Sequence, residues 1–162
     1  PGGLGGKGSE GVTALVQQTP GAIGYVELTY ALTNKISYAQ LKNHDGQWVD
    51  ATLEGVTAAA ASASSNMPSD FRVSIVDAPG ANSYPISSFT WLLVYQNQND
   101  PTRGPMLVTF LKWALTDGQS YASSLYYAPL PPEVVKMELS EIGEIKVAGE
   151  TTNDHRLGEN NR

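Results

Sequence analysis

The stretch Asp77-Ala-Pro-Gly-Ala-Asn-Ser-Tyr-Pro-Ile-Ser-Ser-Phe-Thr-Trp-Leu-Leu-Val-Tyr95 decides how the rest of the chain is organised. Its first half contains Pro79-Gly80 and Asn82-Ser83, residue pairs that are typical of turns. Its second half, residues 89–95, is almost continuously aromatic, β-branched or aliphatic, which predicts a strand covered on both faces, as in an α/β sheet. Pro85 stands at the entrance, where a strand tolerates a residue without an N–H. We therefore expect this strand to be a crossover between two packing units.

Composition limits the kinds of protein that this chain can be. Its 162 residues are enough for one ordinary domain with a hydrophobic core. A formal charge of −6, without a cluster of Lys and Arg, argues against nucleic-acid binding. No apolar run approaches the roughly 20 residues of a membrane span. Because the sequence has no cysteine, it predicts neither a disulfide nor a thiolate metal site.

Apolar periodicity and turn residues predict alternating helices and strands on either side of the crossover. Glycine-rich residues 1–8 are expected to form a loop, and residues 143–162 a disordered polar tail. Three helices are predicted from their caps: one begins at Ser9, one begins at Asp50 or Thr52 and runs to residue 62, and one follows Thr102 and covers residues 103–115. Three further helices are predicted over residues 28–33, 119–124 and 133–142. The predicted strands cover 22–27, 37–42, 48–49 and 71–76, with the second and third joined as a hairpin through residues 44–47.

The start of the chain resembles a nucleotide phosphate loop but fails two requirements of that motif. In Gly2-Gly-Leu-Gly-Gly-Lys-Gly-Ser9, Pro1 stands where the first glycine belongs, and Gly8 stands where Ser or Thr would hold magnesium. A simpler anion site is left open, formed by Lys7, Gly8 and Ser9 at the start of a helix. The alternative, that the glycines only allow the chain to turn, is also open.

Other residues with reactive side chains lack the neighbours that catalysis or metal binding would need. His44 falls in the hairpin turn and His155 in the polar tail, and neither has a second ligand at metal spacing. The sequence contains no G-x-S-x-G nucleophile motif. Glu27 and Asp77 lie near predicted strand ends, where an α/β crevice would open, although such carboxylates are more often solvated or capping groups. The tryptophans Trp48, Trp91 and Trp113 are predicted to be core residues.

Three blocks of the sequence occur in an order and at a spacing typical of one family. They are Gly5-Gly-Lys-Gly-Ser-Glu-Gly-Val12 with Gln18-Thr-Pro-Gly-Ala-Ile-Gly-Tyr-Val-Glu27, then Asp77-Ala-Pro-Gly80 with Tyr84-Pro-Ile-Ser-Ser-Phe-Thr-Trp91, and finally Phe110-Leu-Lys-Trp-Ala114 with Tyr127-Ala-Pro-Leu-Pro131. In these blocks the chain resembles the substrate-binding proteins of bacterial Pst-type phosphate ABC transporters. The resemblance covers roughly residues 2 to 142 and corresponds to the C-terminal half of such a protein. We therefore expect the sequence to be part of a longer chain.

The resemblance implies an α/β fold of the type II-like periplasmic binding-protein kind, with helices packed on mixed sheets. Two lobes joined by crossover strands would close around one phosphate ion. Residues 1–84 would belong to the second lobe and residues 85–142 to the C-terminal part of the first, with Tyr84, Pro85, Ile86 and Ser87 as the hinge. In the family, phosphate is held by Ser and Thr hydroxyls, helix N-termini, an Arg and an Asp. None of these residues matches a position here, so Lys7, Gly8 and Ser9 are the only candidates from this chain.

The predicted function is therefore that of a solute-binding component for phosphate uptake, not of an enzyme. The resemblance implies a monomeric protein of the periplasm or cell surface without cofactor or metal, whose partners are inorganic phosphate and the permease subunits of the transporter. Two alternatives stay open. One is a phosphatase-like hydrolase, and the other is a secreted interaction module on the same scaffold.

Overall fold

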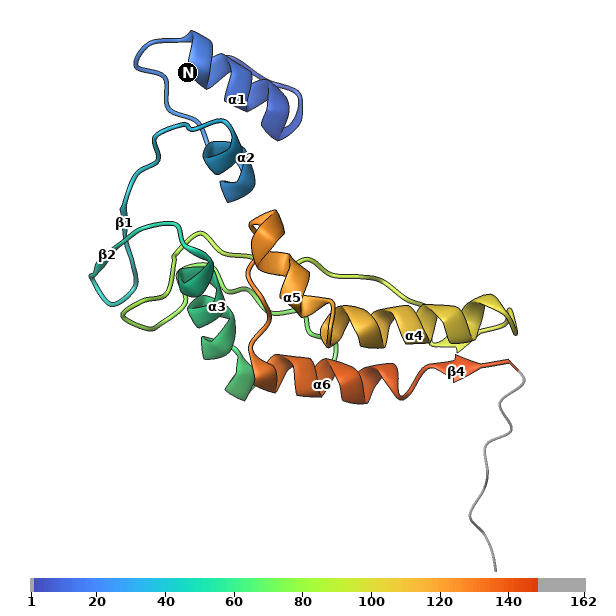
Figure 1. The fold of residues 1–162 in the computed structure, drawn as a ribbon. Helices are drawn as coiled ribbons and strands as arrows, with labels where there is room; N and C mark the ends of the chain where they lie inside the picture. The colour runs from blue at the N-terminus through green and yellow to red at the C-terminus, as the bar shows by residue number, and fades with distance from the viewer. Residues whose placement is uncertain (1, 149–162) are drawn as a thin grey trace, which may run out of the picture.

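The computed structural model describes residues 2–148. Six α-helices lie within that part of the chain, and they account for most of its regular structure (Figure 1). They are α1 (Gly8–Gln18), α2 (Leu28–Thr33), α3 (Leu53–Ser62), α4 (Arg103–Leu115), α5 (Gln119–Ala122) and α6 (Pro132–Ile142). The 3₁₀ turns η1 (Ser64–Asn66) and η2 (Ser123–Leu125) extend α3 and α5.

The strands are short and form two small sheets. β1 (Leu41–Lys42) pairs antiparallel with β2 (Trp48–Val49), as the turn at residues 44–47 predicts. β3 (Asn97–Gln98) pairs in parallel with β4 (Lys146–Val147), which brings the chain after α6 back beside the start of α4. Gly104 of α4 packs closely here, because a Cβ at this position would lie 2.9 Å from Val147 Cγ1.

The helices fall into groups along the molecule (Figure 1). α1 packs against α2 at the N-terminal end, and α4 packs against α6 beyond α3. The α4–α6 group buries Leu111, Val134 and Ile142. Pro132 begins α6 at its first helical position, where the missing N–H costs no intrahelical hydrogen bond.

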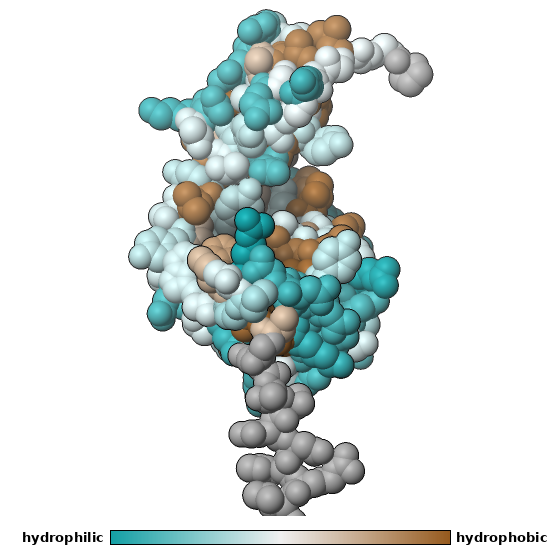
Figure 2. Space-filling model, turned by 90° about the vertical axis from the view of Figure 1, so that its right-hand side faces the viewer, coloured by the Kyte–Doolittle hydropathy of each residue, from teal (hydrophilic) through white to brown (hydrophobic). Residues whose placement is uncertain are grey.

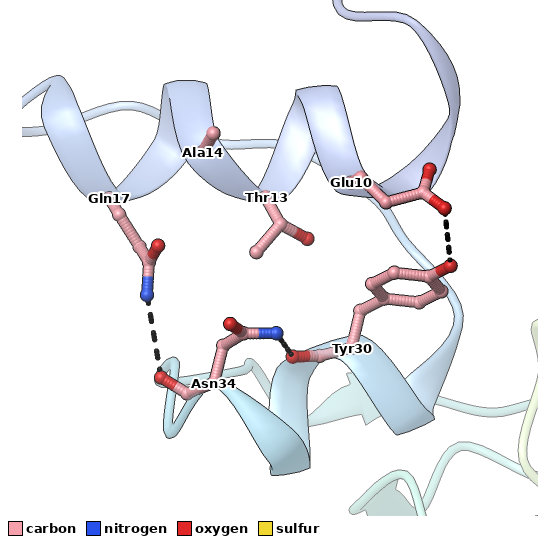
Figure 3. Close-up of a pocket in the computed structure, with 6 residues that line it drawn as sticks. All are labelled: Glu10, Thr13, Ala14, Gln17, Tyr30 and Asn34. Atoms are coloured by element: carbon pink, nitrogen blue, oxygen red, sulfur yellow. Dashed lines mark hydrogen bonds between the residues drawn. The ribbon is translucent and has the colours of Figure 1, made fainter.

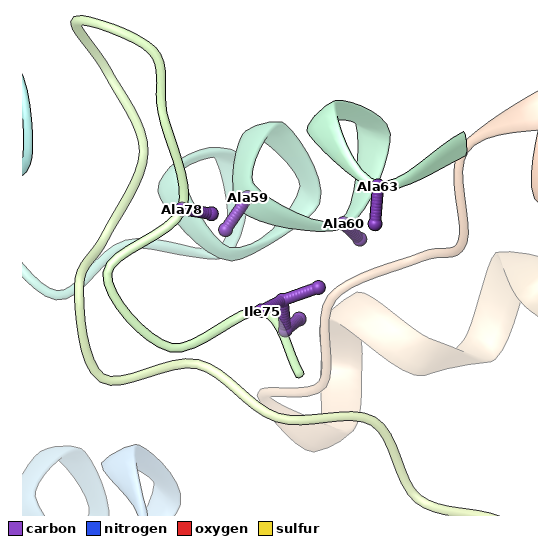
Figure 4. Packing of buried hydrophobic residues seen from close by; sticks show 5 residues of the cluster. All are labelled: Ala59, Ala60, Ala63, Ile75 and Ala78. Carbon is purple, nitrogen blue, oxygen red and sulfur yellow. The ribbon is translucent and has the colours of Figure 1, made fainter. Parts of the chain in front are cut away.

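A separate apolar cluster lies beneath α3 (Figure 4). Ala59 and Ala60 of the helix, with Ala63 at its C-cap, pack on Ile75 and Ala78, and Ile75 is only 2% exposed. Small alanine side chains allow this irregular segment to approach the helix closely. Thr52 caps α3 by accepting a hydrogen bond from the Gly55 amide at 3.0 Å, which confirms one of the two caps predicted for this helix.

Most of the predicted long strands are not formed within residues 2–148. Residues 22–27, 71–76 and 89–95 have no strand assignment, and only Leu41–Lys42 of the predicted strand at 37–42 is paired. The prediction at 71–76 fails for a local reason, since Phe71 has a left-handed φ of 57° and its carbonyl accepts a hydrogen bond from the Val73 amide at 3.0 Å. Residues 89–95 find no neighbouring strand in the described part of the chain. The prediction that this stretch is covered on both faces is therefore wrong for this structure.

Several smaller predictions also need correction. Ser9 lies inside α1, and Lys7 is its N-cap residue. Thr102 makes no capping hydrogen bond, and Asp100 Oδ1 accepts from the Thr102 and Arg103 amides, both at 2.9 Å. β3 lies in a polar stretch, residues 96–101, where no strand is predicted. Residues 143–148, assigned to the polar tail, include the paired strand β4, and the rest of that predicted tail lies outside the described residues.

The three tryptophans are not core residues. Trp48, Trp91 and Trp113 are each at least 44% exposed. Trp113 packs on the surface of α4 against Phe110 and Tyr121, with ring centroids 5.9 and 6.1 Å apart. These tryptophans lie at the surface because no other helix or strand of the described chain covers them fully.

Candidate functional site

The predicted anion site lies where the glycine-rich loop enters α1. Lys7 is the N-cap residue with an exposed side chain, Gly8 begins the helix with a φ of 66°, and Ser9 follows in the first turn. Gly6 sits against the backbone of Gly11, where a Cβ would approach the carbonyl carbon to 2.5 Å. A close approach of this kind requires glycine, so Gly6 at least serves the geometry of the loop.

The side chain of Glu10 occupies the space beside the backbone amides at the start of α1. Its carboxylate lies so close to Gly8 that a Cβ there would come within 2.6 Å of Oε2. A hydrogen bond from the Glu10 backbone N–H and another from the Tyr30 hydroxyl hold the pKa of the Glu10 carboxyl below its ordinary value. The carboxylate therefore takes the place at the helix start that a bound anion would otherwise take.

A hollow of about 190 Å³ lies between α1 and α2, and five of its six lining residues carry a polar group (Figure 3). Glu10, Thr13 and Gln17 enter it from α1, while Tyr30 and Asn34 face them from α2 and its C-terminal end. Two hydrogen bonds span it: Tyr30 Oη donates to Glu10 Oε1 at 3.0 Å, and Gln17 Nε2 donates to the Asn34 carbonyl at 3.4 Å.

The hollow offers hydrogen-bond donors and acceptors but no positive charge. The Glu10 carboxylate raises the pKa of Tyr30 by accepting its hydroxyl proton in a hydrogen bond. Thr13 is 5% exposed, and its Oγ1 has no hydrogen-bond partner within the described residues. Sequence reasoning missed this hollow, although Glu10, Thr13 and Gln17 recur at helical spacing and so share one face of α1. The position of α2 opposite that face could not be deduced from the spacing.

The four predicted hinge residues are held against α3 and the preceding turn. The Tyr84 amide donates to the Gly55 carbonyl at 3.0 Å, and the Pro85 carbonyl accepts from the Asp77 amide at 2.8 Å. Ser87 is buried, and its hydroxyl donates to the Tyr84 carbonyl at 2.8 Å, whereas Ile86 is 65% exposed. Beyond Ser87, Phe89 still packs on the cluster beneath α3, whereas Leu93 is 97% exposed.

The other candidate residues are dispersed over the surface. Asp77 Oδ2 lies 3.5 Å from His44 Nδ1, with both side chains more than half exposed. Glu27 Oε2 accepts a hydrogen bond of 3.4 Å from the Tyr127 hydroxyl. His155 lies outside the described residues. No group of three or more His, Asp or Glu side chains suited to a metal ion occurs in residues 2–148, and no helix there is long and apolar enough to cross a membrane.

The family of this chain follows from its similarity to known proteins. A family model described as a PBP superfamily domain matches residues 2–118. The chain belongs to this superfamily, which confirms the predicted α/β binding-protein class, with helices and small sheets.

Individual relatives show which proteins of this superfamily the chain is similar to. "Phosphate-binding protein PstS" of Xylella fastidiosa (strain Temecula1) is 45% identical over 136 residues, which are 84% of this chain and 37% of that protein. Proteins of the same name from Methanocaldococcus jannaschii and Pasteurella multocida are 37% and 36% identical, over 89% and 84% of this chain. The chain spans 37–40% of the length of these relatives. The resemblance that the three sequence blocks indicate is thereby confirmed.

Proposed function

We propose that this chain forms part of a substrate-binding protein that captures inorganic phosphate between two lobes and delivers it to the permease of an ABC transporter. The observation that carries the proposal is the 45% identity to a phosphate-binding protein over 84% of the chain. The match of the superfamily model to residues 2–118 supports the same class of protein. Such a protein binds its ligand and performs no chemistry on it, acts as a monomer, and works in the periplasm or at the cell surface.

Within that protein, residues 1–84 would belong to one lobe and residues 85–142 to the other. The hinge would lie at Tyr84, Pro85, Ile86 and Ser87. Support comes from the two apolar groups: the buried members of the cluster around Ile75 all lie within residues 59–78, while α4 packs on α6. Hydrogen bonds hold Tyr84, Pro85 and Ser87, whereas Leu93 is 97% exposed, which would put the pivot on the C-terminal side of this hinge segment.

The phosphate ligands of the whole protein would come mainly from other parts of it. Glu10 already covers the amides at the start of α1, and no Lys or Arg side chain lines the hollow beside it. A carboxylate there repels an oxyanion. Lys7, Gly8 and Ser9 are thus candidate phosphate ligands only if the Glu10 side chain adopts another rotamer and uncovers the helix start.

The proposal can be tested in a full-length chimera in which this chain replaces the matching segment of the Xylella fastidiosa relative. We expect the chimera to retain phosphate in equilibrium dialysis, to reject sulfate, and to hydrolyse no chromogenic phosphate ester. A folded chimera that does not bind phosphate, beside a parent protein that does, would contradict the proposal. Turnover of the ester would favour a hydrolase instead.

The isolated 162-residue chain provides a complementary test. We expect millimolar phosphate to leave its melting temperature unchanged, because a ligand stabilises only a state that binds it. If the melting temperature rises, the ligand residues lie in this chain. In that case Lys7→Gln should abolish the rise, and Lys112→Gln, at an exposed lysine of α4, should preserve it.

A further inference from the structure

One linker contacts the part of the chain on the other side of the proposed hinge at two points. Residues 126–131, the strap, run from η2 past α3 to the start of α6 (Figure 1). Thr57 Oγ1 of α3 donates to the Pro129 carbonyl of the strap at 3.0 Å, and Tyr127 Oη donates to Glu27 Oε2 at 3.4 Å. Thr57 and Glu27 belong to residues 1–84, whereas the strap belongs to residues 85–142. The strap is therefore a connection between the two proposed lobes in addition to the hinge.

The strap has a fixed shape, because its residues have little backbone freedom. Tyr126 begins it in the left-handed conformation, with a φ of 61°, and the Tyr126 amide donates to the Ser123 carbonyl at 3.1 Å. Pro129 and Pro131 each fix their own φ and restrict the preceding residue to extended conformations. A proline-rich linker behaves as a semi-rigid spacer. A displacement of one end of the strap is therefore transmitted to the other end.

Hydrogen bonds also attach the strap to the helices of its own lobe. The Tyr127 amide donates to the Ala122 carbonyl at 3.0 Å, and the Leu130 amide donates to Gln119 Oε1 at 2.8 Å. Gln119 Nε2 donates in turn to the Ala114 carbonyl, near the end of α4, at 2.8 Å. The strap is therefore positioned by α4 and α5, and a movement of these helices moves the strap with them.

On the other side, the strap meets α3 beside the proposed hinge. The Gly55 carbonyl, two residues before Thr57, accepts a hydrogen bond from the Tyr84 amide at 3.0 Å. A Cβ at Gly55 would lie 3.3 Å from Tyr84 Cβ, so the backbone of α3 and the hinge segment are in close contact. The first half of α3 therefore contacts both connections to the other lobe, the hinge segment and the strap.

The second contact of the strap lies at the end of the molecule that carries α1 and α2. Glu27 is the N-cap residue of α2, so a hydrogen bond to its carboxylate holds the start of that helix. Figure 2 shows that the molecule is narrower between this end and the larger part below it. Two contacts on different helices fix the direction of a rigid linker as well as its position, which a single contact does not.

We propose that the strap restricts the rotation of the two lobes about the hinge. Thr57, whose contact is the shorter and the less exposed, would be the main positioning residue, and Glu27 the second. The inference rests on the proposed two-lobe function, because domains joined by a hinge move relative to one another unless further contacts hold them. A protein that adopts its binding-competent arrangement only part of the time binds its ligand more weakly by that fraction. Thr57 and Glu27 would therefore strengthen phosphate binding without touching the ion.

Distances between spin labels test the strap in the 162-residue chain itself, without phosphate. The sequence has no cysteine, so labels attach only at Ala61→Cys on α3 and Lys112→Cys on α4, both at exposed residues. We expect one narrow distance distribution by double electron–electron resonance. Thr57→Val, which removes the hydroxyl but keeps the shape of the side chain, should raise the population outside the main peak about 2–10-fold, the factor by which one hydrogen bond shifts an equilibrium. Thr57→Ser, which keeps the hydroxyl, should leave the distribution narrow.

The contact at Glu27 has its own label pair and control. With labels at Gln18→Cys on α1 and Lys112→Cys, Tyr127→Phe should broaden the distribution, but less than Thr57→Val does at its own pair, because an exposed hydrogen bond of 3.4 Å is weak. Tyr126→Phe is the control, since the Tyr126 hydroxyl makes no hydrogen bond within residues 2–148, and it should change nothing. Both tyrosines are exposed, so these variants keep the test valid if Thr57→Val does not fold.

Phosphate binding by the full-length chimera described above completes the test. Thr57→Val should raise its Kd for phosphate about 2–10-fold, mainly through faster release, and Thr57→Ser should not. If the chimera binds no phosphate, the proposed function fails, while the label distances still decide whether the strap restricts rotation. Distance distributions that stay the same in Thr57→Val and Tyr127→Phe would overturn the inference. An unchanged Kd beside a broadened distribution would also overturn it, because the restriction would then not serve binding.

Discussion

Residues 77–87 and 89–95 follow one another directly, and both are irregular, yet their surroundings are opposite. In the first segment Ser83, Pro85 and Ser87 are buried. Asn43 ties it down from the β1–β2 hairpin, with Nδ2 within 2.9–3.2 Å of the carbonyls of Gly80, Ala81 and Ser83. In the second segment Phe89 still packs on the cluster beneath α3, but Leu93 is 97% exposed and the backbone amides find no partner among residues 2–148.

The difference shows that hydrophobicity alone does not bury a segment. Residues 77–87 are more polar than residues 89–95, but their polar groups are satisfied by a helix end, a hairpin side chain and their own turns. The backbone amides of residues 89–95 find no such partners in the part of the chain that the structure describes. Four predictions follow from this contrast between satisfied and open regions, in order of decreasing effect.

The largest effect is expected from the same substitution at one buried and one exposed isoleucine. Ile75→Ala, at a side chain 2% exposed under α3, should lower the free energy of unfolding by about 2–4 kcal/mol because it leaves a cavity. Ile23→Ala, at a side chain 98% exposed, should change it by less than about 0.5 kcal/mol. Urea denaturation of the isolated chain measures both. Similar losses would mean that residues 23–26 are already packed in this chain.

The next effect concerns the anchor of residues 77–87. Asn43→Ala removes the donor to three carbonyls and the acceptor for the Gln47 amide, which Oδ1 holds at 2.9 Å. The expected loss is about 1–3 kcal/mol, since the carbonyl of the buried Ser83 is left unpaired. Asn82→Ala, at an exposed residue of the same segment, serves as the control and should be nearly neutral. Equal denaturation midpoints for the two variants would show that Asn43 does not hold the segment.

A smaller effect is expected at the helix starts. Thr52→Ala removes the cap of α3 and should cost about 1 kcal/mol, whereas Thr52→Ser should retain most of it. Thr102 precedes α4 without a capping bond, so Thr102→Ala should have little effect. Thermal unfolding followed by circular dichroism compares the three variants. A larger shift from the Thr102 variant would contradict the assigned caps.

The smallest effect depends on pH. Hydrogen bonds from the Arg103 amide and then the Thr102 amide lower the pKa of Asp100 below its ordinary value of 3.8. A carboxyl with a lower pKa in the folded state stabilises that state above pH 3.8 and loses this contribution as the pH falls through the folded pKa. Asp100→Asn should therefore destabilise the chain at neutral pH and do so progressively less below pH 3.8. A difference from wild type that persists unchanged at pH 2 would exclude the carboxylate charge as its cause.

The elements that the sequence predicts correctly are those held by interactions between residues close together in the chain. The helices at α1, α2, α3, α4 and α6 and the β1–β2 turn are where periodicity, Pro132 and the His44-Asp45-Gly46 turn indicate them. Caps were less predictable. Thr52 was indicated correctly, but Thr102 caps nothing, because Pro105 has no N–H and the Gly104 amide donates to the Asp100 carbonyl. At the candidate site, the polar face of α1 was visible in the spacing, while Glu10 as the group covering the helix start was not.

Sequence alone determined the superfamily, the helices and the tight hairpin, because each depends on residues within a few positions of one another or on blocks of residues that relatives share. Only the tertiary structure decided that Ile75 is buried while Leu93 is exposed, that Asn43 holds the turn at residues 80–83, and that β4 returns to β3. A helix closes its hydrogen bonds within one segment, whereas a strand depends on a neighbour that its own sequence does not specify.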